Sequence, residues 1–175
     1  VNGKRKKLSP IDYRPSTKKW ALTGCRGRKP NVIRSLYLKE GDLEKLNLIL
    51  QKKYKTIQEK EQRYDGLFLD DAQIILVAYG TMARIAKSVV NKLREEGKRI
   101  GLIRPITLWP FPKDIFKRIT HNARHITFLT IEMSYGQMLE DVKLALNCKF
   151  PVEFLGRAGG GIPTEEDIIK SLSRL

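Results

Sequence analysis

The stretch from Gln73 to Thr81, QIILVAYGT, constrains the fold of this chain more than any other segment. Five apolar residues run from Ile74 to Ala78, and Tyr79 leads directly into Gly80 and Thr81. A short apolar run that ends at a glycine and precedes a helical pattern is typical of a central strand in an open sheet. The sequence therefore predicts a buried strand over 74–79 that turns directly into a helix.

The rest of the chain repeats this alternation. The predicted strands are 74–79, 99–104, 126–132 and 152–156, and the predicted helices are 82–96, 112–119, 135–147 and 164–172. Strands that alternate with helices indicate a mostly parallel sheet covered on both faces, which is a three-layer α/β/α fold. We expect three parts: a basic extended arm over 1–41, a long amphipathic helix with a linker over 42–70, and the α/β domain over 71–175.

The long helix is predicted from Asp42 to Tyr64. Apolar residues fall seven apart along it, with two more between them, and they are Leu43, Leu50, Ile57 and Tyr64 with Leu46 and Tyr54. This spacing gives one apolar stripe on a helix that is otherwise rich in Lys, Glu and Gln. We expect the helix to lie across the domain or across a neighbouring subunit.

The net charge of +15 is concentrated in the arm. Residues 1–30 hold ten Lys and Arg residues against the single acid Asp12, whereas residues 31–72 are balanced. Such an arm suits nucleic acid or an acidic partner protein, but it lacks the interleaved aromatics that stack on bases, so we expect no nucleic acid. The segment from Trp20 to Leu38 is too apolar for a loose linker, and we expect part of it to pack on a surface.

Several classes of protein are disfavoured by simple features. No apolar run approaches the roughly 20 residues that span a bilayer, and the N-terminal residues lack a secretory signal, so we expect a cytoplasmic protein. Cys25 and Cys148 form no CxxC pair and cannot build a zinc or iron–sulfur site by themselves. His121 and His125 fall between a helix and a strand, at the amino end of the sheet, and are expected to be solvated.

The carboxyl ends of the predicted strands gather the candidate site. Gly80 with Thr81, Arg104, Glu132 and Arg157 follow the four strands, and loops converge at this edge of a parallel sheet. We expect an ion-pair cluster centred on Glu132, which either forms a binding surface or only fixes the loops. The glycines at 159–161 precede a helix and could cradle a phosphate, but their spacing fits no nucleotide fingerprint, and a tight turn is the expected role.

Six motifs carry a resemblance to a known family. They are WALTG at 20–24, PNVIRSLYL at 30–38, VAYGTMARIAKS at 77–88, LIRPITLWPFP at 102–112, IEMSYGQMLEDV at 131–142 and VEFLGRAGG at 152–160. Together they resemble the C-terminal part of the α subunit of 2-oxoacid:ferredoxin oxidoreductases, the group acting on 2-oxoglutarate, 2-oxoisovalerate or pyruvate. The resemblance implies a transketolase C-terminal-like domain, called domain II, with four parallel strands and a short antiparallel edge strand near Gly66 to Leu69.

The resemblance also implies a role within a complex. Such complexes use thiamine diphosphate, magnesium, iron–sulfur clusters and coenzyme A to decarboxylate a 2-oxoacid and reduce ferredoxin. The cofactor lies between a pyrimidine-binding domain and the β subunit, so this chain is expected to be an inactive scaffold that binds no cofactor alone and contacts ferredoxin only indirectly. The positions that match the motifs, expected at the interface or the rim of the sheet, are Gly80, Thr81, Arg104, Pro105, Glu132, Gly136, Gln137 and Arg157.

One motif departs from the family. Ser134 stands where the family usually has Asn, and its shorter hydroxyl has less reach for hydrogen bonding. Two other functions stay open from the sequence. One is a docking module whose basic arm recruits an acidic protein such as ferredoxin, and the other is a stand-alone anion or nucleotide sensor that uses the rim arginines and the glycine turn.

Overall fold

The structure is a computed structural model that describes residues 24–121 and 125–175. The first part of the predicted arm, including Trp20, lies outside the described residues. The described residues belong to two compact units, which divide between Leu46 and Asn47, within helix α1 (Asp42–Lys60).

The first unit contains turns and exposed apolar side chains. Arg28 Nη2 donates a hydrogen bond to the carbonyl oxygen of Gly24 at 2.7 Å, and Gly24 and Gly27 both have positive φ angles. Ile33 is 97% exposed and Leu38 is 86% exposed. The expected packing of this segment on a surface therefore stays a prediction.

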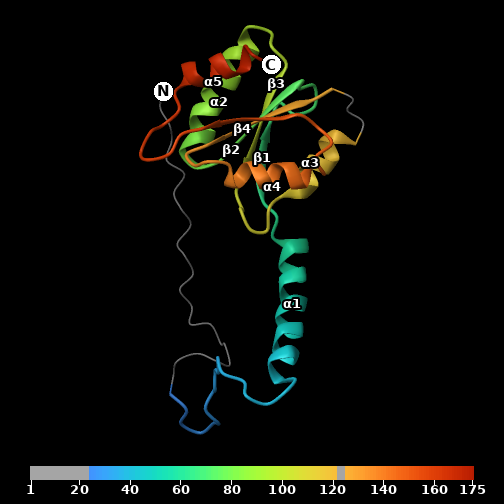
Figure 1. The fold of residues 1–175 in the computed structure, drawn as a ribbon, viewed down its shortest axis with the longest axis vertical. Coiled ribbons are helices and arrows are strands. Elements are labelled where there is room, and N and C mark those ends of the chain that lie inside the picture. Colours follow the sequence, from blue (N-terminus) through green and yellow to red (C-terminus); the bar gives the residue numbers. More distant parts are fainter. Residues whose placement is uncertain (1–23, 122–124) are drawn as a thin grey trace. The chain divides into compact units, whose positions relative to one another are not determined.

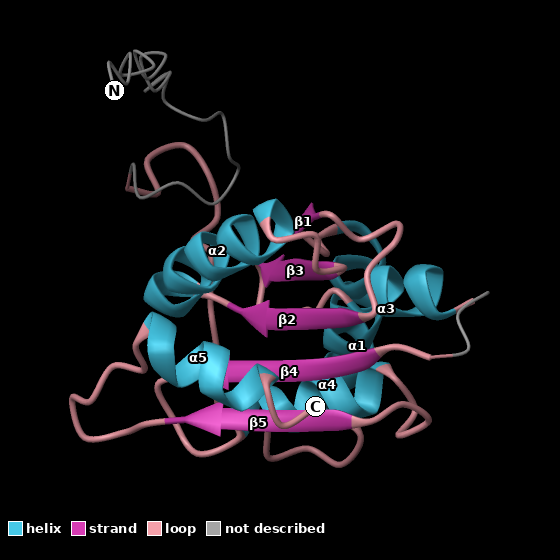
Figure 2. Cartoon of the chain, turned by 90° about the horizontal axis from the view of Figure 1, so that it is seen from above, coloured by secondary structure: helices cyan, strands magenta, loops and turns pink. Residues whose placement is uncertain are grey.

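The second unit contains one sheet in the order β1-β3-β2-β4-β5. Its strands are β1 (Tyr64–Leu67), β2 (Ile74–Ala78), β3 (Ile100–Pro105), β4 (Thr127–Glu132) and β5 (Val152–Gly156). The last four are parallel, and the arrowheads of β2, β3 and β5 point the same way in Figure 2. The edge strand β1 runs antiparallel to β3, as the resemblance implied, but it begins two residues earlier than expected. Phe68 ends it, since its φ of 52° is incompatible with an extended strand.

Four helices cover the two faces of this sheet. They are α2 (Gly80–Glu95), α3 (Lys113–Thr120), α4 (Gln137–Ala145) and α5 (Glu165–Leu172). Helices α2 and α5 lie on one face, and α3 and α4 lie on the other (Figure 1). The predicted three-layer α/β/α fold is confirmed.

Strand β2 is buried on both faces, which explains its continuous apolar run. Ile75 and Val77 belong to the core that includes Phe116 of α3, whereas Leu76 and Ala78 belong to the opposite core beneath α2 and α5. All four of these β2 residues have an exposed fraction of 0%. A strand with both faces covered cannot alternate apolar and polar residues, because each would be buried.

The helix ends follow local signals. Gly97 has a φ of 79° and donates its N–H to the carbonyl of Arg94 at 2.9 Å, which ends α2. Helix α5 begins with a capping box, because Thr164 Oγ1 accepts from the N–H of Asp167 at 3.2 Å and the Asp167 carboxylate accepts from the N–H of Thr164 at 2.9 Å.

Helix α1 differs from the other helices. It ends at Lys60, four residues before the predicted end, because Tyr64 belongs to strand β1 and pairs with Pro105. No residue of α1 is buried. The side chains of its apolar stripe are therefore half-buried or exposed along the helix.

Candidate interaction site at the carboxyl rim of the sheet

The four parallel strands end at one edge of the sheet, so the predicted site residues follow them there. Gly80 and Thr81 open helix α2 directly after β2, with Tyr79 as the N-cap. Gly80 has a φ of 57°, which favours glycine at the sharp change from strand to helix. Pro105 is the last residue of β3 and is buried, whereas Arg104 before it is exposed.

A groove of about 880 Å³ lies between edge strand β1, strand β3 and the first turns of α2. Three of the predicted residues, Gly80, Thr81 and Arg104, line it together. Two further cations, Arg84 and Lys87, line it from α2. These two cations were not predicted from the sequence, although Thr81, Arg84 and Lys87 follow one another at spacings of three residues, which makes consecutive members neighbours on a helix surface.

Arg104 forms an ion pair across the edge strand. Its Nε lies 3.0 Å from Asp65 Oδ2, and its Nη2 contacts the same oxygen. The two residues face each other in the antiparallel register of β1 and β3. Both side chains are about half exposed, at 47% and 60%, so the pair adds little to stability, at most about 1 kcal/mol. The groove is therefore lined by three cations, Arg84, Lys87 and Arg104, and by one carboxylate, that of Asp65.

The predicted ion-pair cluster around Glu132 is wrong. Glu132 is only 1% exposed, and its carboxylate accepts from the N–H of Met138 at 3.1 Å and from the N–H of Leu139 at 3.4 Å. Arg104 pairs instead with Asp65, and Arg157 pairs with Asp167. The first amides of a helix have no partner within the helix and carry partial positive charge. These amides of α4 take the place of the expected guanidinium groups.

Ser134 completes the binding of this carboxylate. Its hydroxyl donates to Glu132 Oε2 at 2.6 Å, so the shorter side chain still reaches a partner at the strand end. Gly136 is the N-cap of α4 and has a φ of 109°, where other residues would be strained. The side chain of Gln137 accepts from the N–H of Tyr135 at 3.2 Å. Glu132, Ser134, Gly136 and Gln137 thus shape one loop and leave Tyr135 77% exposed beside it.

Arg157 holds the loop that follows β5. Its Nη1 donates to the carbonyl of Ile162 at 3.2 Å and lies 3.9 Å from Asp167 Oδ2. Hydrogen bonding from the backbone N–H of Thr164 lowers the pKa of the Asp167 carboxyl, and the charge of Arg157 adds to that effect. Gly159 and Gly160 have positive φ angles, which fits the expected tight turn.

The described residues do not provide a resident metal or cluster site. Within 24–121 and 125–175, no three His, Cys, Asp or Glu side chains come together to hold a metal ion. Cys25 and Cys148 are both exposed, and so are His121 and His125. These donors do not fit the magnesium or iron–sulfur groups that the resemblance implies for the whole complex. Among the described helices, none has the length and apolar character to cross a membrane.

Comparison with known proteins agrees with the motifs. Residues 72–168 match the model of the pyruvate:ferredoxin oxidoreductase core domain II. The ketoisovalerate oxidoreductase subunit VorB of Methanothermobacter marburgensis is 40% identical over 165 residues, which cover 94% of this chain and 46% of that protein. The 2-oxoglutarate synthase subunit KorA of Methanocaldococcus jannaschii is 32% identical over 102 residues, which cover 58% of this chain and 27% of that protein.

A solved structure gives the same fold. The 2-oxoglutarate:ferredoxin oxidoreductase from Magnetococcus marinus matches 79% of this chain and 24% of its own chain, with a TM-score of 0.65 and 14% identity. The chain spans less than half the length of the VorB relative, at 46%. The names VorB and KorA do not agree on one subunit designation for these relatives, so the expected α designation stays a prediction.

Proposed function

Because this chain belongs to the pyruvate:ferredoxin oxidoreductase core domain II family, we propose that it is the subunit-interface part of a 2-oxoacid:ferredoxin oxidoreductase, with residues 71–175 as its α/β domain. It corresponds to the C-terminal part of one subunit of such an enzyme. In this proposal the chain supplies contacts to the pyrimidine-binding domain and to the β subunit. The chemistry comes from cofactors that the rest of the complex binds.

One observation carries this proposal: the polar residues at the carboxyl rim hold loops or line an open groove. The one buried carboxylate of the rim, Glu132, directs its hydrogen bonds to Ser134 and helix α4. Arg104, Arg84 and Lys87 instead face the groove beside α2. Exposed cations around a concave surface support binding to a partner that carries acidic residues.

The relatives support a substrate class for the complex. The VorB proteins of two Methanothermobacter species are both 40% identical to the chain over more than nine tenths of its length, and their name specifies ketoisovalerate. We propose a branched 2-oxoacid as the preferred substrate of the assembled enzyme. Turnover of ketoisovalerate, pyruvate and 2-oxoglutarate by the complex tests this choice, and equal kcat/KM values for the three acids would contradict it.

Reconstitution tests the interface role. The chain is mixed with the remaining subunits of its complex, and 2-oxoacid-dependent reduction of a viologen dye is followed. We expect no turnover by the chain alone and turnover by the assembled enzyme. Turnover by the purified chain, or no association with the other subunits, would overturn the proposal.

Charge reversal then tests the groove. Arg84→Glu with Arg104→Glu is expected to weaken assembly by roughly ten- to hundredfold and to weaken its dependence on salt. Lys98→Glu with Arg99→Glu is the matched control, because these exposed cations precede β3 at the amino end of the sheet. Equal assembly by the two variants would remove the groove from the interface.

A further inference from the structure

A second surface of the 47–175 unit has the properties of a docking site, and it begins on helix α1. Leu50, Tyr54 and Ile57 are spaced by four and then three residues, so they share one face of the helix. Leu50 and Ile57 are half-buried, and Tyr54 is 40% exposed. An isolated helix of about this length is marginal in water, because helical stability in proteins comes mainly from packing of the apolar face. This face has little such packing in the free chain.

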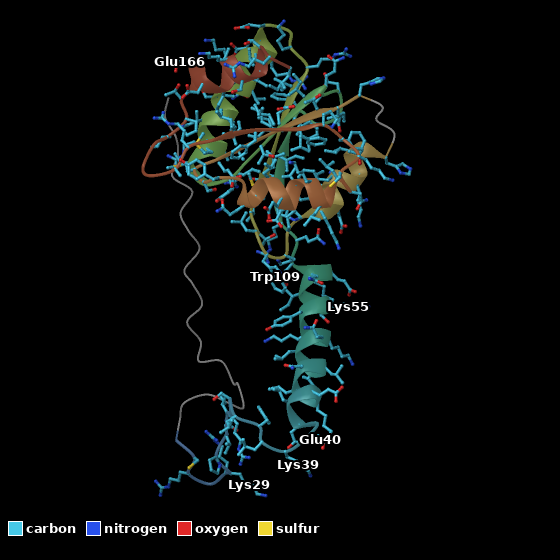
Figure 3. The ribbon with its side chains drawn as sticks, in the orientation of Figure 1. Lys29, Lys39, Glu40, Lys55, Trp109 and Glu166 are labelled. Atoms are coloured by element: carbon cyan, nitrogen blue, oxygen red, sulfur yellow. The ribbon has the colours of Figure 1, made fainter. Side chains whose placement is uncertain are left out.

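Trp109 extends the apolar face beyond the helix. Its ring meets that of Tyr54 edge to face, with 5.7 Å between the ring centroids and an interplanar angle of 86°. Figure 3 shows Trp109 beside the C-terminal half of α1, the half that carries Lys55. Trp109 is 56% exposed, and the preceding Leu108 is 45% exposed. Half-exposed Trp and Tyr side chains in contact are typical anchors of protein interfaces.

A groove of about 430 Å³ adjoins these aromatic rings. It is lined by Trp109, by Gln58 of α1 and by Leu144 of α4, which is 70% exposed. Gln58 lies four residues after Tyr54, so the groove continues from the same side of α1. The apolar surface therefore runs from Leu50 through the aromatic pair to Leu144.

The charges at its margins point to one kind of partner. Lys53 and Lys60 are seven residues apart and flank the Leu50–Ile57 face on one side, and Lys113 and Lys117 line the adjoining groove. Asp141 is the carboxylate among the groove-lining residues, and burial raises its pKa. A second copy of this chain would bring lysines toward lysines, which disfavours self-association. A partner with carboxylates beside an apolar ridge fits both margins.

We propose that Leu50, Tyr54, Ile57 and Trp109, with the adjoining groove, form a docking surface for an acidic amphipathic helix of a partner subunit. This inference rests on the proposed function and adds a second contact to the rim groove. The partner helix inserts apolar side chains between α1 and α4 and places carboxylates near the four lysines. Helix α1 is thereby stabilised on assembly.

The first test uses paired variants of the full chain in the reconstituted complex. Leu50→Asp with Ile57→Asp is expected to weaken assembly by roughly 30-fold or more. Leu48→Asp is the matched control, because Leu48 lies about 180° around the helix from Ile57 and is already 64% exposed. Equal effects of the two variants would overturn the inference. Tyr54→Ala with Trp109→Ala gives the same test without a charge in α1.

The second test addresses the acidity of the partner. Lys53→Glu with Lys60→Glu, which changes the flank of the face, is expected to weaken assembly roughly tenfold at low salt. Lys52→Glu with Lys55→Glu makes the same charge change on the opposite side of α1 and is expected to leave assembly unchanged. Stronger assembly of the Lys53/Lys60 variant, or the same loss in both variants, would contradict an acidic partner.

The third test uses fluorescence of the chain in the complex. Trp20→Phe leaves Trp109 as the single tryptophan, since the sequence contains two. Its emission is expected to shift to shorter wavelength on assembly, because the ring leaves water. An unshifted emission, or a shift that appears on concentrating the chain alone as it dimerises, would overturn the inference. The inference fails and the proposed function stands if Arg84→Glu with Arg104→Glu abolishes assembly, while the variants of α1 and Trp109 assemble normally and the Trp109 emission does not shift. No assembly by the unmodified chain would reject both.

Discussion

Strand β2 and helix α1 are both rich in apolar residues, but these residues are buried in β2 and not in α1. Ile75, Leu76 and Val77 of β2 are fully buried between two helical layers. Helix α1 has no buried residue, and Leu43 and Tyr54 of its apolar stripe are 50% and 40% exposed. An apolar pattern satisfied within the chain supports the fold, whereas one left open marks a surface for another molecule.

The largest difference is expected between a core aromatic and the α1 stripe. Phe116 is fully buried, and its ring centroid lies 5.6 Å from that of Phe111 and 5.9 Å from that of Phe128. Phe116→Ala is expected to lower the free energy of unfolding by about 3–5 kcal/mol, because it leaves a cavity. Ile57→Ala in the free chain is expected to cost less than about 1 kcal/mol. Urea unfolding followed by circular dichroism measures both, and similar losses would break the distinction.

An intermediate effect on stability is expected from Glu132 in the α/β domain. Glu132→Ala removes the acceptor of the Met138 and Leu139 amides and leaves these groups unpaired near the start of α4. The free energy of unfolding is expected to fall by about 1–3 kcal/mol. Ser134→Ala is the control, because it removes one hydrogen-bond donor and leaves both hydrogen bonds from the Met138 and Leu139 amides. Its loss of stability is expected to be smaller. A larger loss in the Ser134 variant would show that the hydroxyl, rather than the helix amides, stabilises the carboxylate.

The capping box of α5 is expected to contribute less and to depend on pH. Thr164→Ala is expected to cost about 1 kcal/mol at neutral pH. The pKa of Asp167 is lowered in the folded chain, first by the backbone N–H of Thr164, so its contribution is present above its unfolded pKa. That contribution is lost as the pH falls through the folded pKa. Unfolding curves at neutral and acidic pH compare the free energy of unfolding of the unmodified chain with that of the double variant Thr164→Ala/Asp167→Asn. The difference between the two should become smaller in acid. A difference that does not change with pH would show that the charge of Asp167 does not contribute.

The smallest expected effect has the opposite sign. Thr130 is fully buried, and its Oγ1 has no hydrogen-bond partner among the described residues. Thr130→Val keeps a similar shape and removes an unsatisfied hydroxyl, so stability is expected to rise by up to about 1 kcal/mol. Thermal unfolding measures the change. A lower melting temperature would show that the hydroxyl has a partner, such as a buried water.

Local signals allowed much of the fold to be predicted from the sequence. The range of β5 agrees with the prediction at both ends, and Thr164 with the acidic residues after it located the start of α5. The prediction for α1 ran too far because the seven-residue spacing continued to Tyr64, which pairs with β3 instead. Pairing between distant strands competes with local periodicity and cannot be read from spacing alone.

The candidate site shows the same limit. The sequence placed Gly80, Thr81 and Arg104 at one edge, and the structure brings them to one groove. It could not supply the partner of Arg104, because Asp65 lies 39 residues earlier on an edge strand whose register sets the contact. It also could not show that α4 amides would satisfy Glu132. Strand ends are predictable from pattern, whereas side-chain partners depend on tertiary register.

Hydrogen exchange of the full chain, free and in the assembled complex, tests most directly that the chain is a folded domain completed by its partners. In the free chain the β2 amides should exchange slowly and those of residues 47–60 in α1 rapidly, since only the strand lies in a packed core. Assembly should slow exchange across residues 47–60 by roughly tenfold or more and leave β2 unchanged. Rapid exchange of α1 in both states, or equal protection of α1 in both, would contradict the account.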